Sequence, residues 1–312
     1  MLNILSTLLL FASLQGLASA AAPAATGAAP ATLAEARRNF STALTPMANA
    51  PQQMPRPPAR FFVRADYVSG KFKLPAFVTP DPKDGQRRAA VIWTDGGELD
   101  AVEPLWMSPS GSDLVNPLVK QGVVVMVPSL RGRGYGKTGA AEYFLGEADD
   151  LLAAAAHLAT LPYVDPARIY LAGSGPGATL ALLVVEQSTA FKEVFALEPA
   201  HEIDGYSDFV MPQEIKRLAV RERRMRSPIH WLHGIASPAH LIATRGTPGD
   251  SDSAAKLCAA SRNAQLRCVF VSGVASIDLI EPTLRAVGKR IAGNTPVAQP
   301  LTGEQILAGQ RR

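Results

Sequence analysis

The pattern of apolar and polar positions predicts strands first at residues 61–78. Apolar and polar residues alternate there on both sides of Ser69-Gly70, as in a β-hairpin, and we expect this hairpin at one edge of a sheet. Further along the chain, short apolar runs without alternation are typical of strands that helices bury on both faces. These runs lie at 89–94, 123–127, 168–172, 193–197, 240–244 and 267–271.

Helical segments separate these predicted strands. The segment 147–161 is rich in Ala and Leu and ends before Pro162, which cannot continue a helix. Further helices are predicted at 177–187, 253–261 and 281–291. Strands and helices therefore alternate through residues 61–292, which predicts an α/β fold: a doubly wound, mostly parallel sheet with helices on both faces.

Composition changes sharply at both ends of this predicted domain. The apolar run at 4–17, followed by Ala18-Ser19-Ala20, fits a secretory signal peptide over residues 1–20. We therefore expect a periplasmic or secreted protein. Residues 21–60 are dominated by Ala and Pro and lack the large apolar side chains of a core, which predicts a disordered linker. Residues 293–312 are expected to form a C-terminal tail.

Charge and cysteine usage exclude several classes of function. A net charge of +4 over 312 residues is modest, and no Cys and His spacing typical of zinc is present, so we expect no nucleic-acid partner, metal or cofactor. No later stretch reaches the roughly 18 apolar residues of a membrane helix, which argues against an integral membrane protein. Cys258 and Cys268 either form a disulfide between a predicted helix and a predicted strand, or remain two buried thiols.

The motif Gly173-Ser174-Gly175-Pro176-Gly177 follows a predicted buried strand and begins a helix. This strand, turn and helix form the context of a nucleophile elbow. With the elbow and the segments at 93–97, 128–132 and 163–169, the chain resembles the prolyl oligopeptidase-like and dienelactone-hydrolase-like branch of the α/β hydrolases. The resemblance implies an α/β-hydrolase fold over residues 61–292.

The elbow departs from the pattern of that branch. The family's nucleophilic serine occupies the third place of G-x-S-x-G, and here that place holds Gly175, between Gly173 and Gly177. The lone Ser174 comes one position early, and because side chains alternate along the preceding strand, we expect it to point elsewhere. Glycine tolerates positive φ, so Gly175 would keep the shape of the turn without supplying a reacting atom.

The other catalytic positions implied by the resemblance are also altered. The family's histidine lies in the loop after the last strand, but no histidine follows His240. The aligned position is Ser276 or, as the second choice, Ile277, and neither accepts a proton at neutral pH. The acid corresponds to Asp250 or Asp252. Without a histidine to orient, a turn residue or a helix N-cap is the simpler role, and we favour the cap for Asp252.

Asp95, Gly96 and Gly97 correspond to the oxyanion loop of the family. Asp95 takes a place that often holds histidine, which puts negative charge where an anionic intermediate would form. The backbone of Gly96 and Gly97 would still offer donors to a carbonyl or a carboxylate. Residues 201–237 lie where hydrolases insert a lid, and the basic run at 214–226 within them is either an anion-attracting or membrane-touching lid or a solvated helix face.

The leading interpretation is an exported, non-catalytic homologue whose pocket binds a small-molecule or peptide ligand, or which serves as a scaffold for a partner protein. The alternative is an active serine hydrolase on ester or peptide bonds, with Ser174 as nucleophile. Its base would come from His201, His230, His233 or His240. A third hypothesis is a different reaction on the same fold, catalysed by Asp95, Asp250 or Asp252. A fourth is a stable protein whose pocket has no function.

Overall fold

A computed structural model describes residues 32–44, 56–57, 61–95, 116–132, 139–208, 211–246 and 252–308. The chain divides into two compact units, Met1–Pro30 and Ala31–Arg312, and every described residue belongs to the second. The predicted signal peptide at 1–20 thus lies outside the described residues. In the part of the chain that is described, no helix is long and apolar enough to span a bilayer.

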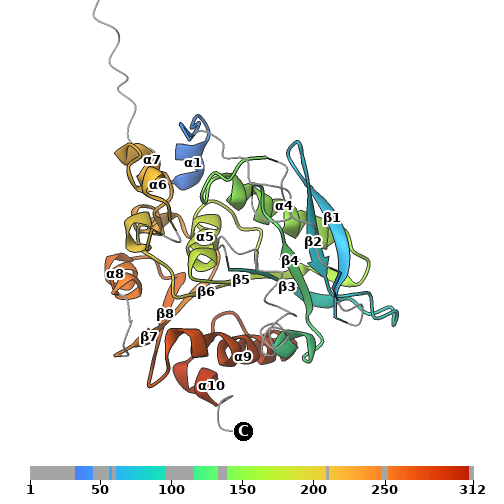
Figure 1. The fold of residues 1–312 in the computed structure, drawn as a ribbon. Helices are drawn as coiled ribbons and strands as arrows, with labels where there is room; N and C mark the ends of the chain where they lie inside the picture. The colour runs from blue at the N-terminus through green and yellow to red at the C-terminus, as the bar shows by residue number, and fades with distance from the viewer. Residues whose placement is uncertain are drawn as a thin grey trace, which may run out of the picture. The chain divides into compact units, whose positions relative to one another are not determined.

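Within the described residues, the strands form one eight-stranded sheet in the order β1-β2-β4-β3-β5-β6-β7-β8 (Figure 1). The strands are β1 (Val63–Ser69), β2 (Phe72–Val78), β3 (Arg88–Thr94), β4 (Val124–Pro128), β5 (Val164–Ser174), β6 (Val194–Leu197), β7 (Ala239–Arg245) and β8 (Leu266–Ser272). β1 and β2 form the predicted antiparallel hairpin at one edge, and β2 is also antiparallel to β4. All remaining pairs are parallel, which confirms the predicted doubly wound α/β sheet.

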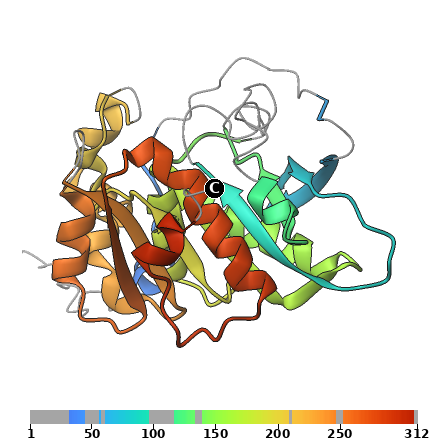
Figure 2. The ribbon, with the colours of Figure 1, turned by 90° about the horizontal axis from the view of Figure 1, so that it is seen from below.

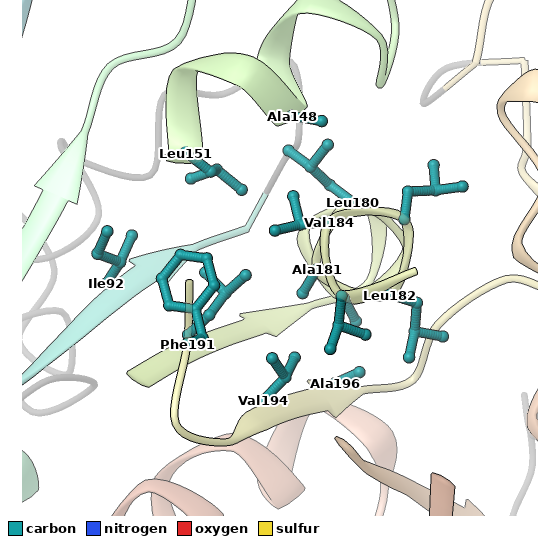
Figure 3. Close-up of a cluster of buried hydrophobic side chains, with 14 of the residues drawn as sticks. Ile92, Ala148, Leu151, Leu180, Ala181, Leu182, Val184, Phe191, Val194 and Ala196 are labelled. Carbon is teal, nitrogen blue, oxygen red and sulfur yellow. The ribbon is translucent and has the colours of Figure 1, made fainter. Parts of the chain in front are cut away.

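Helices pack on both faces of this sheet (Figures 1 and 2). One face carries α4 (Gly146–Thr160), α5 (Pro176–Val185) and α8 (Ser253–Ala260), and the other carries α9 (Ile280–Ala292). Every residue of α5 after Pro176 is buried. Figure 3 shows why: the apolar side chains of α5 lie between those of the sheet and of α4. This burial fixes the helix that begins at the elbow.

The predicted linker at 21–60 is wrong for residues 32–44. Thr32 and Glu35 form a capping box at the start of α1 (Leu33–Arg37), and Leu33 is buried in the core. The guanidinium group of Arg37 pairs with Asp149 at 2.9 Å. One amphipathic turn with a strong cap is enough to dock this segment, although the surrounding composition is poor in large apolar residues. The docked segment borders a cavity of about 390 Å³, whose lining includes no elbow residue.

The predicted C-terminal tail is also wrong in part. Residues 303–307 form a short helix, α10 (Gly303–Leu307), capped by a capping box between Thr302 and Gln305. Leu301 and Ile306 are buried on the α9 side of the sheet, which explains why this segment packs onto the domain.

Residues 201–237, the insertion between β6 and β7 where a lid was predicted, contain several short helices, and the basic run at 214–226 is divided between two of them. The helices are η1 (Ile203–Gly205), α6 (Gln213–Lys216), α7 (Val220–Met225), η2 (Pro228–His230) and η3 (Leu232–Gly234). Thr42 and the backbone N–H of Ala43 donate to the Glu222 carboxylate of α7, at 3.1 and 2.6 Å. The N-terminal segment therefore helps to hold the insertion in place.

Cys258 and Cys268 form a disulfide, so of the two alternatives left open for these residues the bridge is correct. It joins α8 to β8, and the two Cα atoms lie 6.2 Å apart. The bridge closes a loop of only ten residues, but it ties an outer helix to the last strand of the sheet.

His240 of β7 is a fully buried histidine that stacks on Phe195, with ring centroids 5.2 Å apart. Among the described residues, neither ring nitrogen has a hydrogen-bond partner. Burial, together with the charges of Arg290 and Arg267, lowers the pKa of His240 from 6.5 to about 3. The imidazole is therefore neutral in the folded protein at neutral and mildly acidic pH.

We expect this histidine to make the fold less stable as the pH falls below 6.5. The unfolded chain binds a proton there and the folded chain does not, so the free energy of unfolding drops by about 2 kcal/mol between about pH 7 and about pH 5. His240→Phe keeps the stacking and removes the titration, so its stability should change less over this range. Urea denaturation at both pH values tests this, with exposed His233→Phe as the control. Equal pH dependence in wild type and His240→Phe would contradict it.

Candidate active site

The turn between β5 and α5 has the strained backbone of a nucleophile elbow. β5 ends at Ser174 and α5 begins at Pro176, so Gly175 alone makes the turn, with φ of 52° and ψ of −119°. The Gly175 N–H donates to the carbonyl of Leu197, at the end of β6, at 2.8 Å. Glycine adopts this left-handed backbone without steric cost, whereas a residue with a Cβ is strained there. Gly175 thus takes the place at which an elbow presents its nucleophile.

The two flanking glycines allow strand, turn and helix to approach closely. A Cβ on Gly173 would lie 2.6 Å from the backbone of Gly177, and a Cβ on Gly177 would lie 2.2 Å from the Thr94 carbonyl oxygen. By contrast, a Cβ built on Gly175 meets no atom of the described residues within 4 Å. The elbow thus has room for a side chain at residue 175, but glycine supplies no side chain there.

The residue after the elbow position is Pro176, the first residue of α5. In a nucleophile elbow, the backbone N–H of this residue supplies one of the donors of the oxyanion hole. Proline has no N–H, so this donor is absent. The missing donor is a third defect, besides those predicted at Gly175 and Ser276. It was not predicted from the sequence, although Pro176 is part of the motif.

Asp95 directly follows β3, beside the elbow. Its backbone carbonyl accepts a hydrogen bond from the Gly177 N–H at 2.7 Å, which ties the predicted oxyanion loop to the start of α5. Gly96 and Gly97 lie outside the described residues. The donors expected from their backbone therefore stay a prediction.

Ser174 is the last residue of β5 and is half-buried. In the register between β5 and β6 it pairs with Leu197. The chain has five histidines, all of them described, and among the described residues no hydrogen bond joins the Ser174 side chain to a histidine. The geometry thus does not bring together the serine and histidine that the alternative interpretation requires.

The histidines near the insertion have other partners. His201 Nδ1 lies 2.9 Å from the hydroxyl oxygen of Ser253, and His230 Nε2 lies 3.4 Å from the Glu202 carboxylate. Burial, followed by the charge of Arg224, lowers the pKa of His230. Each of these imidazoles would have to change its contacts to serve a nucleophile at the elbow.

Ser276, at the predicted position of the family's histidine, begins the short helix η4 (Ser276–Leu279) after β8. Its hydroxyl oxygen lies 3.1 Å from Thr244 Oγ1, at the end of β7. The N–H and the hydroxyl of Thr244 both donate to Glu198 Oε1, at 2.7 and 2.9 Å. Because the Thr244 proton is directed to Glu198, Ser276 is the donor to Thr244, and the lone pairs of the Ser276 oxygen stay available.

Glu198 was not among the predicted site residues. It directly follows β6, its φ of 55° is positive, and its N–H donates to the Ile242 carbonyl at 2.9 Å. No Lys, Arg or His nitrogen among the described residues lies within 4.0 Å of its carboxylate. An acidic residue directly after a buried parallel strand is the signal that would have revealed it, since ligands of such sheets bind at the carboxyl ends of the strands.

The predicted acids do not join this chain of hydrogen bonds. Asp250 lies outside the described residues. Asp252 does precede α8, as expected for an N-cap, but its side chain makes no capping hydrogen bond. Its carboxylate is 72% exposed and instead pairs with Lys256 one turn along the helix, at 2.9 Å. The described residues contain no group of three or more His, Cys, Asp or Glu arranged to hold a metal ion.

Most basic side chains of the run at 214–226 have partners within the protein. Arg226 is fully buried and donates to the Glu222 carboxylate at 2.5 Å and to the Glu142 carbonyl at 3.1 Å. The other contacts are Lys216 with Asp208, Arg223 with Asp204, Arg221 on the ring of Phe40, and Arg224 on the ring of Trp231. A simple solvated helix face therefore does not describe this run, because most of its charges have partners within the insertion and two of them, Arg221 and Arg226, also contact residues outside it.

Residues 110–247 match the family model of the prolyl oligopeptidase family, Peptidase_S9. This match covers less than half of the chain and includes the elbow and the insertion. No curated protein sequence matches the chain.

Solved structures of hydrolases and peptidases share the fold. A 2,6-dihydroxy-pseudo-oxynicotine hydrolase matches 78% of this chain and 70% of its own, with a TM-score of 0.58 at 12% identity. An acylaminoacyl peptidase from Pyrococcus horikoshii matches 79% of this chain and 44% of its own, with a TM-score of 0.56 at 14% identity. A puromycin-hydrolysing peptidase from Mycobacterium tuberculosis matches 74% of this chain and 40% of its own, with a TM-score of 0.58 at 18% identity.

The chain spans less than half the length of these two peptidases. At such low identity the structural likeness establishes the fold alone. Taken with the strand order and the elbow, these findings show that the chain has the α/β-hydrolase fold and that its residues 110–247 are similar to the prolyl oligopeptidase family.

Proposed function

We propose that this chain is an exported, non-catalytic α/β hydrolase that uses the former catalytic pocket to bind a ligand. One observation carries the proposal: the elbow keeps its backbone and its close packing, yet three groups that the chemistry requires are missing. Gly175 supplies no nucleophile, Pro176 supplies no oxyanion donor, and Ser276 supplies no base.

The missing groups are worth large factors in rate. Removal of one oxyanion-hole donor costs about 10²–10³ in kcat. Loss of the serine or of the histidine of a triad costs several orders of magnitude, and the remainder of the triad then contributes little by itself. Acyl transfer by the usual mechanism is therefore not expected from this site. Binding needs none of these three groups, and the open space above Gly175 is compatible with it.

Two features support export. The apolar run and small residues at 1–20 predict a cleaved signal peptide. The disulfide between Cys258 and Cys268 is typical of proteins that fold in an oxidising compartment such as the periplasm or the extracellular space.

The alternative is an active serine hydrolase with Ser174 as nucleophile. The match to a peptidase family and the position of Ser174, one residue before the turn, favour it. It requires a base that approaches Ser174 and an oxyanion hole built without the N–H of residue 176. These requirements make it the second choice.

A fluorophosphonate probe separates the two proposals, because it forms a covalent adduct with an activated serine. We expect no adduct on the purified protein by intact-mass measurement, and the same spectrum should show a chain that begins near Ala21. An active serine hydrolase treated in parallel verifies the probe. An adduct on wild type that is absent from Ser174→Ala would overturn the non-catalytic proposal and identify the nucleophile.

A further inference from the structure

The carboxyl ends of β6, β7 and β8 present hydrogen-bond acceptors beside the elbow. Glu198 Oε1 accepts both hydrogen bonds from Thr244, and Glu198 Oε2 accepts none from the described residues. Ser276 donates its proton to Thr244, so its remaining lone pairs are also free to accept. The hydrogen bonds thus run in one direction, from Ser276 through Thr244 to the Glu198 carboxylate.

Glu198 stands beside the elbow. The residue before it, Leu197, pairs with Ser174 in the sheet and accepts the hydrogen bond of the Gly175 N–H. Neighbouring strands of a sheet lie about 5 Å apart, so the backbones of Glu198 and Gly175 adjoin at the same edge. The open space over Gly175 is therefore next to the strand that carries the carboxylate.

The charge of Glu198 is not compensated by the described part of the chain. No basic nitrogen there lies within 4.0 Å of its carboxylate, whereas the buried Glu193 and Asp150 each pair with an arginine. Glu198 is half-buried, and its positive φ is strained for a residue other than glycine. Such strain persists where surrounding contacts fix it, as the bonds to Ile242 and Thr244 do here.

The nearest backbone of the elbow adds no donor that would suit an anion. Pro176 has no N–H, and the N–H of Gly175 is already bound to the Leu197 carbonyl. A carboxylate or an oxyanion at this place would meet the Glu198 charge and no elbow donor. A cationic group with several N–H donors suits this place better, because it neutralises the Glu198 charge and donates to the lone pairs of Glu198 and Ser276 that accept no other hydrogen bond from the described residues.

We propose that this edge of the sheet binds the primary ammonium group of an organic ligand, with Glu198 Oε2 and the Ser276 hydroxyl oxygen as its acceptors. This inference rests on the proposed non-catalytic binding function and names the chemical class of the ligand. An ammonium group carries three donors and one positive charge, which matches a carboxylate and a hydroxyl that both contact the same Thr244 hydroxyl.

The test compares three probes with the same ring and different charge: benzylammonium, benzyl alcohol and benzoate. Two-dimensional ¹H–¹⁵N NMR of the mature protein follows the backbone amides of Gly175, Glu198 and Ser276. We expect saturable shifts with benzylammonium in the millimolar range, binding of benzyl alcohol weaker by about tenfold, and no saturable shift with benzoate. Benzoate binding as tight as or tighter than benzylammonium binding would overturn the proposal.

Two matched carboxylate variants locate the interaction. Glu198→Gln keeps an oxygen that accepts from Thr244 but replaces the charged second oxygen with an amide NH2, which donates, so benzylammonium affinity should fall about tenfold while the fold is preserved. Asp252→Asn changes an exposed carboxylate after β7 that already pairs with Lys256, and it should leave the affinity unchanged. Equal affinities of wild type and Glu198→Gln would contradict the assignment to Glu198.

A fourth probe distinguishes two sources of the same ammonium group. Phenylalanine amide carries the α-ammonium group of a peptide N-terminus, whereas benzylammonium represents a simple amine. Whichever of these two probes binds more tightly indicates whether the natural ligand is a peptide N-terminus or a simple amine. Binding of either probe at Glu198 supports the proposed ammonium site. An adduct with the fluorophosphonate probe would overturn the non-catalytic function alone, whereas failure of all ammonium probes without an adduct would overturn only the ammonium site.

Discussion

Restoring the elbow in full is expected to give esterase activity about a hundredfold above that of a variant that still carries Pro176. The full variant is Gly175→Ser/Pro176→Ala/Ser276→His, and the comparison variant is Gly175→Ser/Ser276→His. Both would supply a nucleophile and a base, but only the first supplies the backbone N–H that the oxyanion hole requires. Hydrolysis of p-nitrophenyl acetate, expressed as kcat/KM, measures the difference.

The structure indicates that the changes at residues 175 and 176 are tolerated. A Cβ at residue 175 meets no atom of the described residues within 4 Å, and the strain of a serine at positive φ, about 1–3 kcal/mol, is inherent to this turn. Alanine is acceptable at the first position of α5, and circular dichroism verifies the fold of each variant. Gly175→Ser/Pro176→Ala, which lacks a base, is the background control. Equal activity of the full and the comparison variant would show that Pro176 is not the limiting defect.

The framework of the fold was predictable because burial imposes a periodicity on the sequence. β4 and β6 are buried at every position, and their apolar runs are continuous for that reason. The hairpin of β1 and β2 lies at the edge of the sheet, where one face of β1 meets solvent and apolar residues alternate with polar ones. Local patterns thus encode the inner strands and the hairpin edge, but not the other edge strand, β8, whose run was predicted to be buried on both faces.

The termini were less predictable because their structure depends on a few residues. Leu33 and Ile306 are each buried in a segment with few other large apolar side chains. In both segments a capping box begins the short helix, at Thr32 and at Thr302. Composition averaged over twenty to forty residues hides such a helix, whereas a search for capping boxes followed by an apolar residue would have found it.

The site was predictable where the motif itself carries the information. The loss of the nucleophile at Gly175 and of the base at Ser276 can be predicted from their aligned positions. The loss of an oxyanion donor at Pro176 can be predicted because proline has no N–H. Glu198 was not predictable in the same way, because its importance comes from hydrogen bonds across three strands. Thr244 and Ser276 lie 46 and 78 positions later in the chain, and only the register of parallel strands brings the Thr244 hydroxyl to the Glu198 carboxylate and the Ser276 hydroxyl to Thr244.

Asp150→Asn is expected to lower the free energy of unfolding by about 3 kcal/mol, because it leaves the buried guanidinium group of Arg131 without its main counter-charge. Asp150 is fully buried in α4 and accepts from the backbone N–H, Nε and Nη2 of Arg131 at 2.8, 3.0 and 2.7 Å. Glu142 and Ser69 contact the same guanidinium group at 3.2 and 3.3 Å, so part of its interaction remains. Urea denaturation of wild type and variant measures the loss.

The adjacent residue provides a matched control. Asp149 also pairs with an arginine, Arg37, but its side chain is 51% exposed, so Asp149→Asn should cost no more than about 1 kcal/mol. A second comparison separates loss of charge from loss of packing. Arg131→Met/Asp150→Leu removes both charges and keeps apolar volume, and should be less destabilising than Asp150→Asn. If Asp149→Asn and Asp150→Asn lower the free energy of unfolding equally, the buried pair of Arg131 and Asp150 stabilises the fold no more than the exposed pair does, which would contradict the prediction.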